Sequence, residues 1–251
     1  MSQTALITGG QRGIGRAIAT ALHSAGFQIA LIAEVASNDP DVNETMSKLP
    51  GARYYTQDLR QTDSLGGLLD RIEGDLGPLT TLISNAGVPA PVRGDLLDVT
   101  PENYDFTQAI NARAGFFLAQ NVARRMLARD TDGYRALCFV TSVSAEMVSV
   151  ERGDYCISKS AAAMTAQLFA ARLAGDGIGV FDIRPGIIDT PMTAGVRDAY
   201  TVRIEDGLVP ARRWGQPDDI GSTILPLVTG QMAFATGAVI PVDGGLSIRR
   251  L

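Results

Sequence analysis

Short apolar runs alternate with amphipathic stretches along the whole chain. Continuous apolar runs of this length, separated by helical patterns, are typical of parallel strands whose sheet is covered by helices on both faces. The expected strands are Thr4–Thr8, Ile29–Ala33, Arg53–Gln57, Thr81–Ser84, Ala136–Ser142, Gly179–Arg184 and Ala238–Val242. We therefore predict an α/β fold, a Rossmann-type doubly wound sheet of about seven parallel strands. No linker, repeat or low-complexity segment interrupts the pattern, so residues 1–251 are expected to form a single domain.

Helix starts are marked between these runs by capping residues, prolines and acids. Such signals are found at Asp39-Pro40-Asp41, at Thr62-Asp63 and at Thr100-Pro101-Glu102. The last of them predicts one long helix over residues 103–129. Three further helices are expected: one that carries Tyr155 and runs to about Ala174, a short one around Ala194–Ile204, and a final one over Asp218–Val228. The segment Ile187–Pro210 is predicted to be an insertion and is a candidate substrate lid.

Composition and charge narrow the class of protein. Hydrophobic residues make up 45% of the chain and charged residues 20%, which is ordinary for a globular protein. A net charge of −5 argues against nucleic acid and against an anionic membrane as partners. No apolar run approaches the roughly 18–20 residues that span a bilayer, and the first strand leaves no room for a signal peptide. With only two cysteines, no disulfide framework is expected, and we predict a cytoplasmic protein.

Several catalytic mechanisms are disfavoured because their residues are scarce. The only histidine, His23, lies in the predicted first helix, far from any candidate nucleophile. One histidine and two cysteines cannot supply a typical closed zinc site. We therefore expect neither metal chemistry nor a serine–histidine mechanism.

A glycine-rich turn joins the first strand to the first helix. It reads Gly9-Gly10-Gln11-Arg12-Gly13-Ile14-Gly15. Glycines let the backbone turn tightly and let a pyrophosphate approach the free N–H groups of a helix N-terminus. In this strand–turn–helix context the turn predicts a dinucleotide site, with a plain tight turn as the alternative. Glu34, after the second strand, is a candidate to bind the adenosine ribose, or is an ordinary solvated charge.

The stretch Val140–Lys159 carries the candidate chemistry. Ser142 follows the fifth strand, and Tyr155 and Lys159 are spaced so that they share one face of the next helix. A nearby cation favours the phenolate form of a tyrosine, which allows a phenol to exchange a proton with an alcohol or carbonyl oxygen. The alternative is that Tyr155 packs in the core while Lys159 is solvated. Lys159 is one of only two lysines in the chain.

Together these residues resemble the short-chain dehydrogenase/reductase family, in the right order and spacing over nearly the whole chain. Residues 8–15 fit its TGxxxGxG loop, residues 85–87 its NAG motif and residues 155–159 its YxxxK motif. Ser142 lies thirteen residues before the tyrosine, and Asn111 takes the place of the family's helix asparagine. Pro185-Gly186 and Asp243-Gly244-Gly245 also fit. Within that family the chain resembles the 3-oxoacyl-carrier-protein reductases.

The resemblance implies a reversible carbonyl reduction or secondary-alcohol oxidation by hydride transfer to or from a nicotinamide. It implies that Tyr155 is the general acid/base, that Lys159 tunes it and holds the ribose, that Ser142 binds the substrate oxygen, and that Asn111 supports a water. Implied cofactor contacts, besides the glycine turn, Glu34, Tyr155 and Lys159, are Asp58, Leu59, Asn85, Ala86, Gly87, Pro185, Gly186, Ile188 and Thr190. Relatives also suggest a homotetramer, or a dimer.

The nicotinamide cofactor is predicted from opposing signals. Members that use NAD usually carry an acid eighteen residues after the last loop glycine; here that position is Ala33, and Glu34 follows it. Arg12 resembles the loop arginines that bind the 2′-phosphate of NADP. Glu34, Asp39 and Asp41 would repel that phosphate. The balance favours NAD(H), with NADP(H) as the alternative.

The substrate is the least constrained prediction. A small free carbonyl or alcohol compound is one expectation, and a 3-oxoacyl group on a carrier protein is the other. The turn Gly175-Asp176-Gly177 places an acid where carrier-protein reductases often have arginine, whereas Arg124, Arg125 and Arg129 partly restore positive charge. Arg93 and Arg152 are candidates to bind a substrate carboxylate. A non-catalytic dinucleotide-sensing module is the remaining alternative, although it would not need Tyr155 and Lys159 together.

Overall fold

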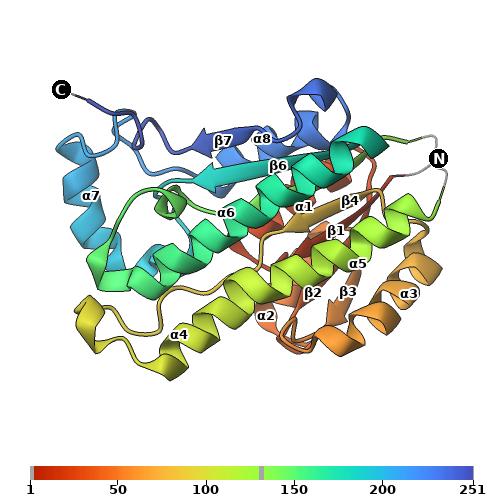
Figure 1. Ribbon diagram of the computed structural model, residues 1–251, viewed down its shortest axis with the longest axis horizontal. Helices are drawn as coiled ribbons and strands as arrows, with labels where there is room; N and C mark the ends of the chain where they lie inside the picture. The colour runs from red at the N-terminus through yellow and green to blue at the C-terminus, as the bar shows by residue number, and fades with distance from the viewer. Residues whose placement is uncertain (1–2, 130–132, 251) are drawn as a thin grey trace.

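A computed structural model describes residues 3–129 and 133–250. A seven-stranded parallel sheet forms the centre of the molecule (Figure 1). The strand order is β3-β2-β1-β4-β5-β6-β7, and every neighbouring pair is parallel. The strands are β1 (Thr4–Thr8), β2 (Gln28–Ala33), β3 (Arg53–Thr56), β4 (Thr81–Ser84), β5 (Arg135–Val140), β6 (Ile178–Pro185) and β7 (Val239–Val242). The reversal of order between β1 and β4 confirms the predicted doubly wound Rossmann-type sheet.

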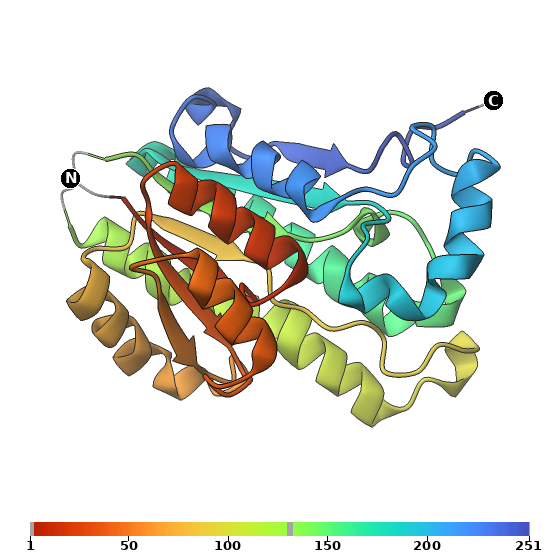
Figure 2. The ribbon, with the colours of Figure 1, turned by 180° about the vertical axis from the view of Figure 1, so that it is seen from behind.

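Helices cover both faces of this sheet. Figure 1 shows the face formed by α3 (Leu65–Leu76), α4 (Pro101–Gln108), α5 (Gly115–Leu127) and α6 (Gly153–Leu173). Figure 2 shows the opposite face, with α1 (Gly13–Ser24), α2 (Pro40–Lys48) and α8 (Pro217–Val228). A buried apolar cluster fills each interface: Leu6, Leu82 and Leu137 face α5 and α3, and Ile7, Ile29 and Phe181 face α1 and α8.

The segment 187–210 leaves the sheet after β6. It contains a 3₁₀ stretch, Pro191–Val196, followed by α7 (Arg197–Glu205). In Figure 1 the arrowheads of β6 and β7 point toward the end of the molecule where α7 lies. The segment therefore stands over the carboxyl edge of the sheet, where open α/β sheets bind their ligands.

The long helix predicted to open at Thr100-Pro101-Glu102 and to run through Arg129 begins at Pro101 and continues to Leu127. It contains a π-helical turn, Ala109–Ala114, between α4 and α5, which was not predicted. Thr100 caps its start by accepting a hydrogen bond from the Asn103 N–H at 3.3 Å, as predicted. Single π turns are frequent at functional sites, so the position of Asn111 inside this turn agrees with a functional role for that residue.

The remaining boundaries match the predicted ones or differ from them by one to three residues, as helix and strand ends commonly do. The predicted short helix around 194–204 is divided between the 3₁₀ stretch and α7. Within residues 3–129 and 133–250, no helix combines the length and the hydrophobicity needed to cross a bilayer.

Candidate active site

The glycine turn has the backbone geometry of a phosphate cradle. Gly9 and Gly13 have positive φ angles of 64° and 54°, which side-chain-bearing residues rarely adopt. A Cβ added at Gly15 would lie 2.2 Å from the Gly9 carbonyl oxygen, so only glycine fits there. No side chain caps the start of α1 at Arg12, which leaves its first N–H groups free for an anion. The turn therefore fits the pyrophosphate of a dinucleotide.

The β4 end is joined to this turn by hydrogen bonds. The Thr8 hydroxyl oxygen accepts the backbone N–H groups of Asn85 at 3.0 Å and Ala86 at 2.9 Å. The Asn85 amide donates to the Thr8 carbonyl oxygen at 2.9 Å and to that of Gly9 at 3.3 Å. Gly87 follows, and a Cβ there would lie 3.2 Å from Asn111 Oδ1 and 3.4 Å from Lys159 Nζ. The NAG segment thus links the glycine turn to Asn111 and Lys159.

The predicted trio comes together at the carboxyl end of β5. Tyr155 and Lys159 are 9% and 6% exposed, and Lys159 Nζ lies 5.8 Å from the centroid of the Tyr155 ring. Lys159 donates to the Val140 carbonyl oxygen at 3.2 Å, which places its ammonium beside the strand end. Ser142 is 8% exposed and accepts the Ser144 N–H at 3.0 Å, which caps a short 3₁₀ turn.

Asn111 holds neighbouring segments together. Its amide donates to the Val88 carbonyl oxygen and to Ser158 Oγ, both at 3.0 Å, and its Oδ1 accepts the Val88 N–H at 2.8 Å. Ser158 Oγ also donates to the Tyr155 carbonyl oxygen at 2.7 Å. Asn111 and Lys159 line a small pocket of about 10 Å³, which is room for about one water molecule.

Most of the charged residues that were considered as contacts of the cofactor's adenosine form ion pairs. Arg12 Nη1 lies 3.4 Å from a carboxylate oxygen of Asp41. Asp58 accepts hydrogen bonds from Arg60, the shortest at 2.6 Å, and these lower the pKa of its carboxyl group. Glu34 is exposed directly after β2 and has no ion-pair partner in the described chain. Burial, and then the charge of Glu34, raise the pKa of the neighbouring Tyr54 to about 12.

The other predicted cofactor contacts lie where the strands end. Leu59 is partly buried against the α3–α5 core, and Gln11 is buried with its side-chain oxygen unpartnered in the described structure. Pro185 ends β6, and a Cβ at Gly186 would lie 2.7 Å from Asp243 Cα.

Residues that follow β6 return to the glycine turn. Ile188 is 4% exposed and pairs with Gly215 in an isolated bridge. Thr190 caps the 3₁₀ stretch of segment 187–210, and a Cβ at Gly13 would lie 3.6 Å from Thr190 Cγ2. His23 is elsewhere, bonded to the Pro50 carbonyl oxygen at 2.9 Å. The structure therefore brings the predicted catalytic and cofactor residues to one edge of the sheet and leaves His23 outside.

The sequence reasoning missed a buried polar network beneath this edge. Asp182, 1% exposed on β6, accepts a hydrogen bond from the Thr141 hydroxyl and one from Arg184 Nε at 2.8 Å. Arg184, 8% exposed, also bonds Glu146, four residues after Ser142. Burial alone lowers the pKa of Arg184, but its bonds to Glu146 and Asp182 raise it overall.

A signal for this network was present in the sequence. Asp182 and Arg184 interrupt an otherwise apolar strand, and a charge in a buried strand requires a partner. The network ties β6 to the loop that carries Ser142.

Known proteins share both this sequence pattern and this structure. The pattern of the family described as enoyl-(acyl carrier protein) reductase matches residues 9–247. The L-xylulose reductase of Bos taurus is 31% identical, over 96% of this chain and 95% of its own length. The chain belongs to the short-chain dehydrogenase/reductase family. It is an NAD(P)-dependent oxidoreductase that acts on a small-molecule substrate.

Solved structures of this family agree. The 3-oxoacyl-(acyl carrier protein) reductase from Brucella melitensis in complex with NAD is 40% identical with a TM-score of 0.95, and the match covers 100% of this chain and 99% of that one. A putative 2-deoxy-D-gluconate 3-dehydrogenase from Agrobacterium tumefaciens with bound NADP is 27% identical with a TM-score of 0.87, covering 98% and 97%. Both nicotinamide dinucleotides therefore occur among the relatives.

Proposed function

We propose that this oxidoreductase reversibly reduces a carbonyl group to a secondary alcohol with Tyr155 as the general acid/base. The observation that carries the proposal is the buried phenol beside the Lys159 ammonium, 5.8 Å from ring centroid to Nζ, at the end of β5. A bound nicotinamide supplies the hydride for reduction, or accepts it for oxidation.

The chain's own residues supply the proton and the orientation. Tyr155 Oη donates a proton to the carbonyl oxygen during reduction and takes it back during oxidation. The Lys159 ammonium stabilises the phenolate left behind, and the Ser142 hydroxyl donates a hydrogen bond that fixes the substrate oxygen. Asn111, in the lining of the small pocket, would hold a water that returns a proton to Tyr155.

The cofactor is assigned to the groups around the glycine turn. The pyrophosphate would be held by the glycine turn, through Gly9, Gln11, Arg12, Gly13, Ile14 and Gly15, with support from Asn85, Ala86 and Gly87. The adenine would be bound near Asp58 and Leu59. The nicotinamide would be bound near Pro185, Gly186, Ile188 and Thr190. Segment 187–210 is the substrate lid within a single domain, a role supported by the approach of Thr190 to Gly13.

NAD(H) is the proposed cofactor. Two arginines could bind a 2′-phosphate, but each is already paired with an acid: Arg12 with Asp41, and Arg60 with Asp58. Glu34 is free to accept hydrogen bonds from the ribose hydroxyls. The relative from Brucella melitensis holds NAD, which agrees with this preference.

The variant Glu34→Arg is expected to shift this preference toward NADP(H) by roughly tenfold or more. It exchanges a charge that repels the 2′-phosphate for one that attracts it. The measurement is the ratio of kcat/KM values for NADH and NADPH. Glu34→Gln, which removes the repulsion without adding attraction, should fall between the two. An unchanged ratio in both variants would exclude Glu34 as the determinant.

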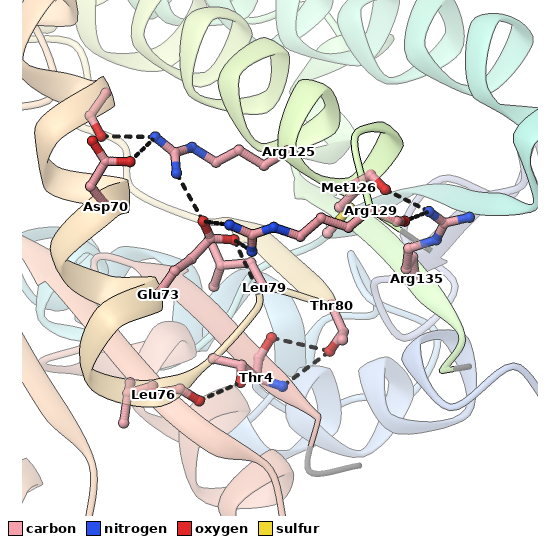
Figure 3. Close-up of polar contacts among 11 residues, drawn as sticks. Thr4, Asp70, Glu73, Leu76, Leu79, Thr80, Arg125, Met126, Arg129 and Arg135 are labelled. Atoms are coloured by element: carbon pink, nitrogen blue, oxygen red, sulfur yellow. Dashed lines mark hydrogen bonds and ion pairs between the residues drawn. The ribbon is translucent and has the colours of Figure 1, made fainter. Parts of the chain in front are cut away.

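A free substrate is favoured over one carried by an acidic protein. Two of the arginines considered as contacts for such a partner are already paired with acids (Figure 3). Arg125 lies 2.7 Å from Asp70 and 2.8 Å from Glu73, and Arg129 lies 2.7 Å from Glu73. Arg172 likewise pairs with Asp176 at 2.7 Å. Reduction of a carrier-bound 3-oxoacyl group remains the second candidate, because the Brucella melitensis relative bears that name.

Loss of NADH absorbance across a panel of ketones, oxo acids, keto sugars and acyl thioesters tests the proposed function. Turnover of free compounds supports it, and turnover of carrier-bound thioesters alone would favour the second candidate. Cofactor binding without any turnover would instead favour a dinucleotide-sensing module.

We also propose a homotetramer in the cytoplasm. Apolar side chains are exposed on α6, with Ile157, Met164 and Leu168 at 48%, 59% and 56%, and β7 is an edge strand. Both cysteines are free, as a reducing compartment requires.

A further inference from the structure

Arg152 places a second cation against the reacting phenol. It ends the 3₁₀ stretch Val150–Arg152, three residues before Tyr155. Its guanidinium carbon lies 5.4 Å from the centroid of the Tyr155 ring, compared with 5.8 Å for Lys159 Nζ. The two cations come from the helical turns on either side of Tyr155. Lys159 is bound to the Val140 carbonyl oxygen at the strand end, so Arg152 is the cation at the open, N-terminal end of α6.

This guanidinium is unusual because it is partly desolvated and has no acceptor. In the described chain five arginines are half-buried or buried: Arg16, Arg125, Arg135, Arg152 and Arg184. The other four donate to a carboxylate or carbonyl oxygen. Arg152 donates to none within residues 3–129 and 133–250, and its Nε is buried. A ligand that brought an acceptor to this guanidinium would therefore add a hydrogen bond that the described chain does not supply.

The neighbouring carboxylates do not neutralise Arg152. Glu151 is exposed, and neither it nor Asp154 forms an ion pair with Arg152. Asp154 instead accepts a hydrogen bond from the Thr107 hydroxyl at 3.0 Å, across the interface with α4. The positive charge at Arg152 is therefore available to a molecule that approaches Tyr155.

We infer that Arg152 binds an anionic group of the substrate. The enzyme would then act on carbonyl and alcohol compounds that carry either a carboxylate or a phosphate group. The inference rests on the proposed function, in which Tyr155 protonates the substrate oxygen. A guanidinium matches the two oxygens of a carboxylate or phosphate with parallel N–H donors. An anion bound to Arg152 would lie beside the Tyr155 phenol, and this would fix the distance between the anion and the reacting carbonyl.

Matched pairs of compounds that differ only in charge test this assignment. Acetoacetate and levulinate are each compared with their methyl esters, and dihydroxyacetone phosphate is compared with dihydroxyacetone. The wild-type enzyme should have a higher kcat/KM for the anionic member of at least one pair. The pair with the larger anionic-to-neutral ratio of kcat/KM values shows whether the site prefers a carboxylate or a phosphate. Arg152→Met should lower that ratio of kcat/KM values about ten- to hundredfold, mainly by raising KM for the anion.

Two further variants separate charge recognition from structural damage. Arg152→Lys keeps the charge and should retain part of the anion preference. Arg124→Met removes an exposed, unpaired arginine on α5 and should leave the ratio at its wild-type value. Turnover with equal efficiency for charged and neutral members, or a ratio unchanged in Arg152→Met, would overturn the inference alone. No turnover of these pairs, together with turnover of other carbonyl compounds, would likewise overturn the inference alone. No turnover of any carbonyl compound despite NADH binding would overturn the proposed function and the inference with it.

Discussion

Tyr155→Phe is expected to lower kcat for carbonyl reduction by about 10²–10⁴-fold while nucleotide affinity stays near the wild-type value. The substitution removes only the phenolic oxygen, which is the proposed proton donor. The ring keeps its place beside Lys159 and Arg152, and Lys159 keeps its bond to the Val140 carbonyl oxygen. The site should therefore still bind the dinucleotide.

Two measurements on the same variant separate chemistry from binding. Loss of NADH absorbance gives turnover, and calorimetric titration gives nucleotide affinity. Tyr104→Phe is a suitable control, because Tyr104 is 38% exposed on α4 and has no assigned role. Near-normal turnover in Tyr155→Phe would contradict the assignment of Tyr155 as the acid/base.

Asp182→Ala should reduce the free energy of unfolding by about 3–5 kcal/mol, the usual cost of removing one partner from a buried ion pair. Asp182 is 1% exposed, and its loss leaves the buried Arg184 guanidinium without the acceptor at 2.8 Å. The Thr141 hydroxyl loses its acceptor as well. Urea denaturation followed by circular dichroism gives the change.

An exposed ion pair supplies the comparison for this prediction. Asp176 pairs with Arg172 at 2.7 Å, with both side chains solvated, so Asp176→Ala should cost less than about 1 kcal/mol. Equal losses in the two variants would mean that the buried network contributes little to stability. Because the network ties β6 to the loop after Ser142, the Asp182 variant should also raise KM for the carbonyl substrate.

Strand positions were predictable from the sequence because buried parallel strands leave continuous apolar runs. Thr4–Thr8 and Thr81–Ser84 match β1 and β4 residue for residue. The π-helical turn at Ala109–Ala114 was not predictable in this way, since apolar periodicity locates a helix but does not show where a single i→i+5 turn falls inside it.

The candidate site was predictable to the extent that it depends on local spacing. Tyr155 and Lys159 share a helix face at i and i+4, and the glycine turn is contiguous in the chain. The partners of Asn111, Arg125 and Arg184 come from other elements, so hydrophobic periodicity carries no information about them. The availability of Arg152 likewise emerges only from the contacts that surround it.

Transfer of deuterium from NADH labelled at C4 to the product is a direct test of hydride transfer to a carbonyl carbon. The enzyme is incubated with each stereospecifically labelled form of the cofactor and with the carbonyl compound that it turns over best, and the product is analysed by mass spectrometry and NMR. The account predicts an alcohol that carries deuterium on the former carbonyl carbon with one of the two forms. An alcohol without deuterium from either form, or no alcohol from any carbonyl compound while NADH binds, would contradict it.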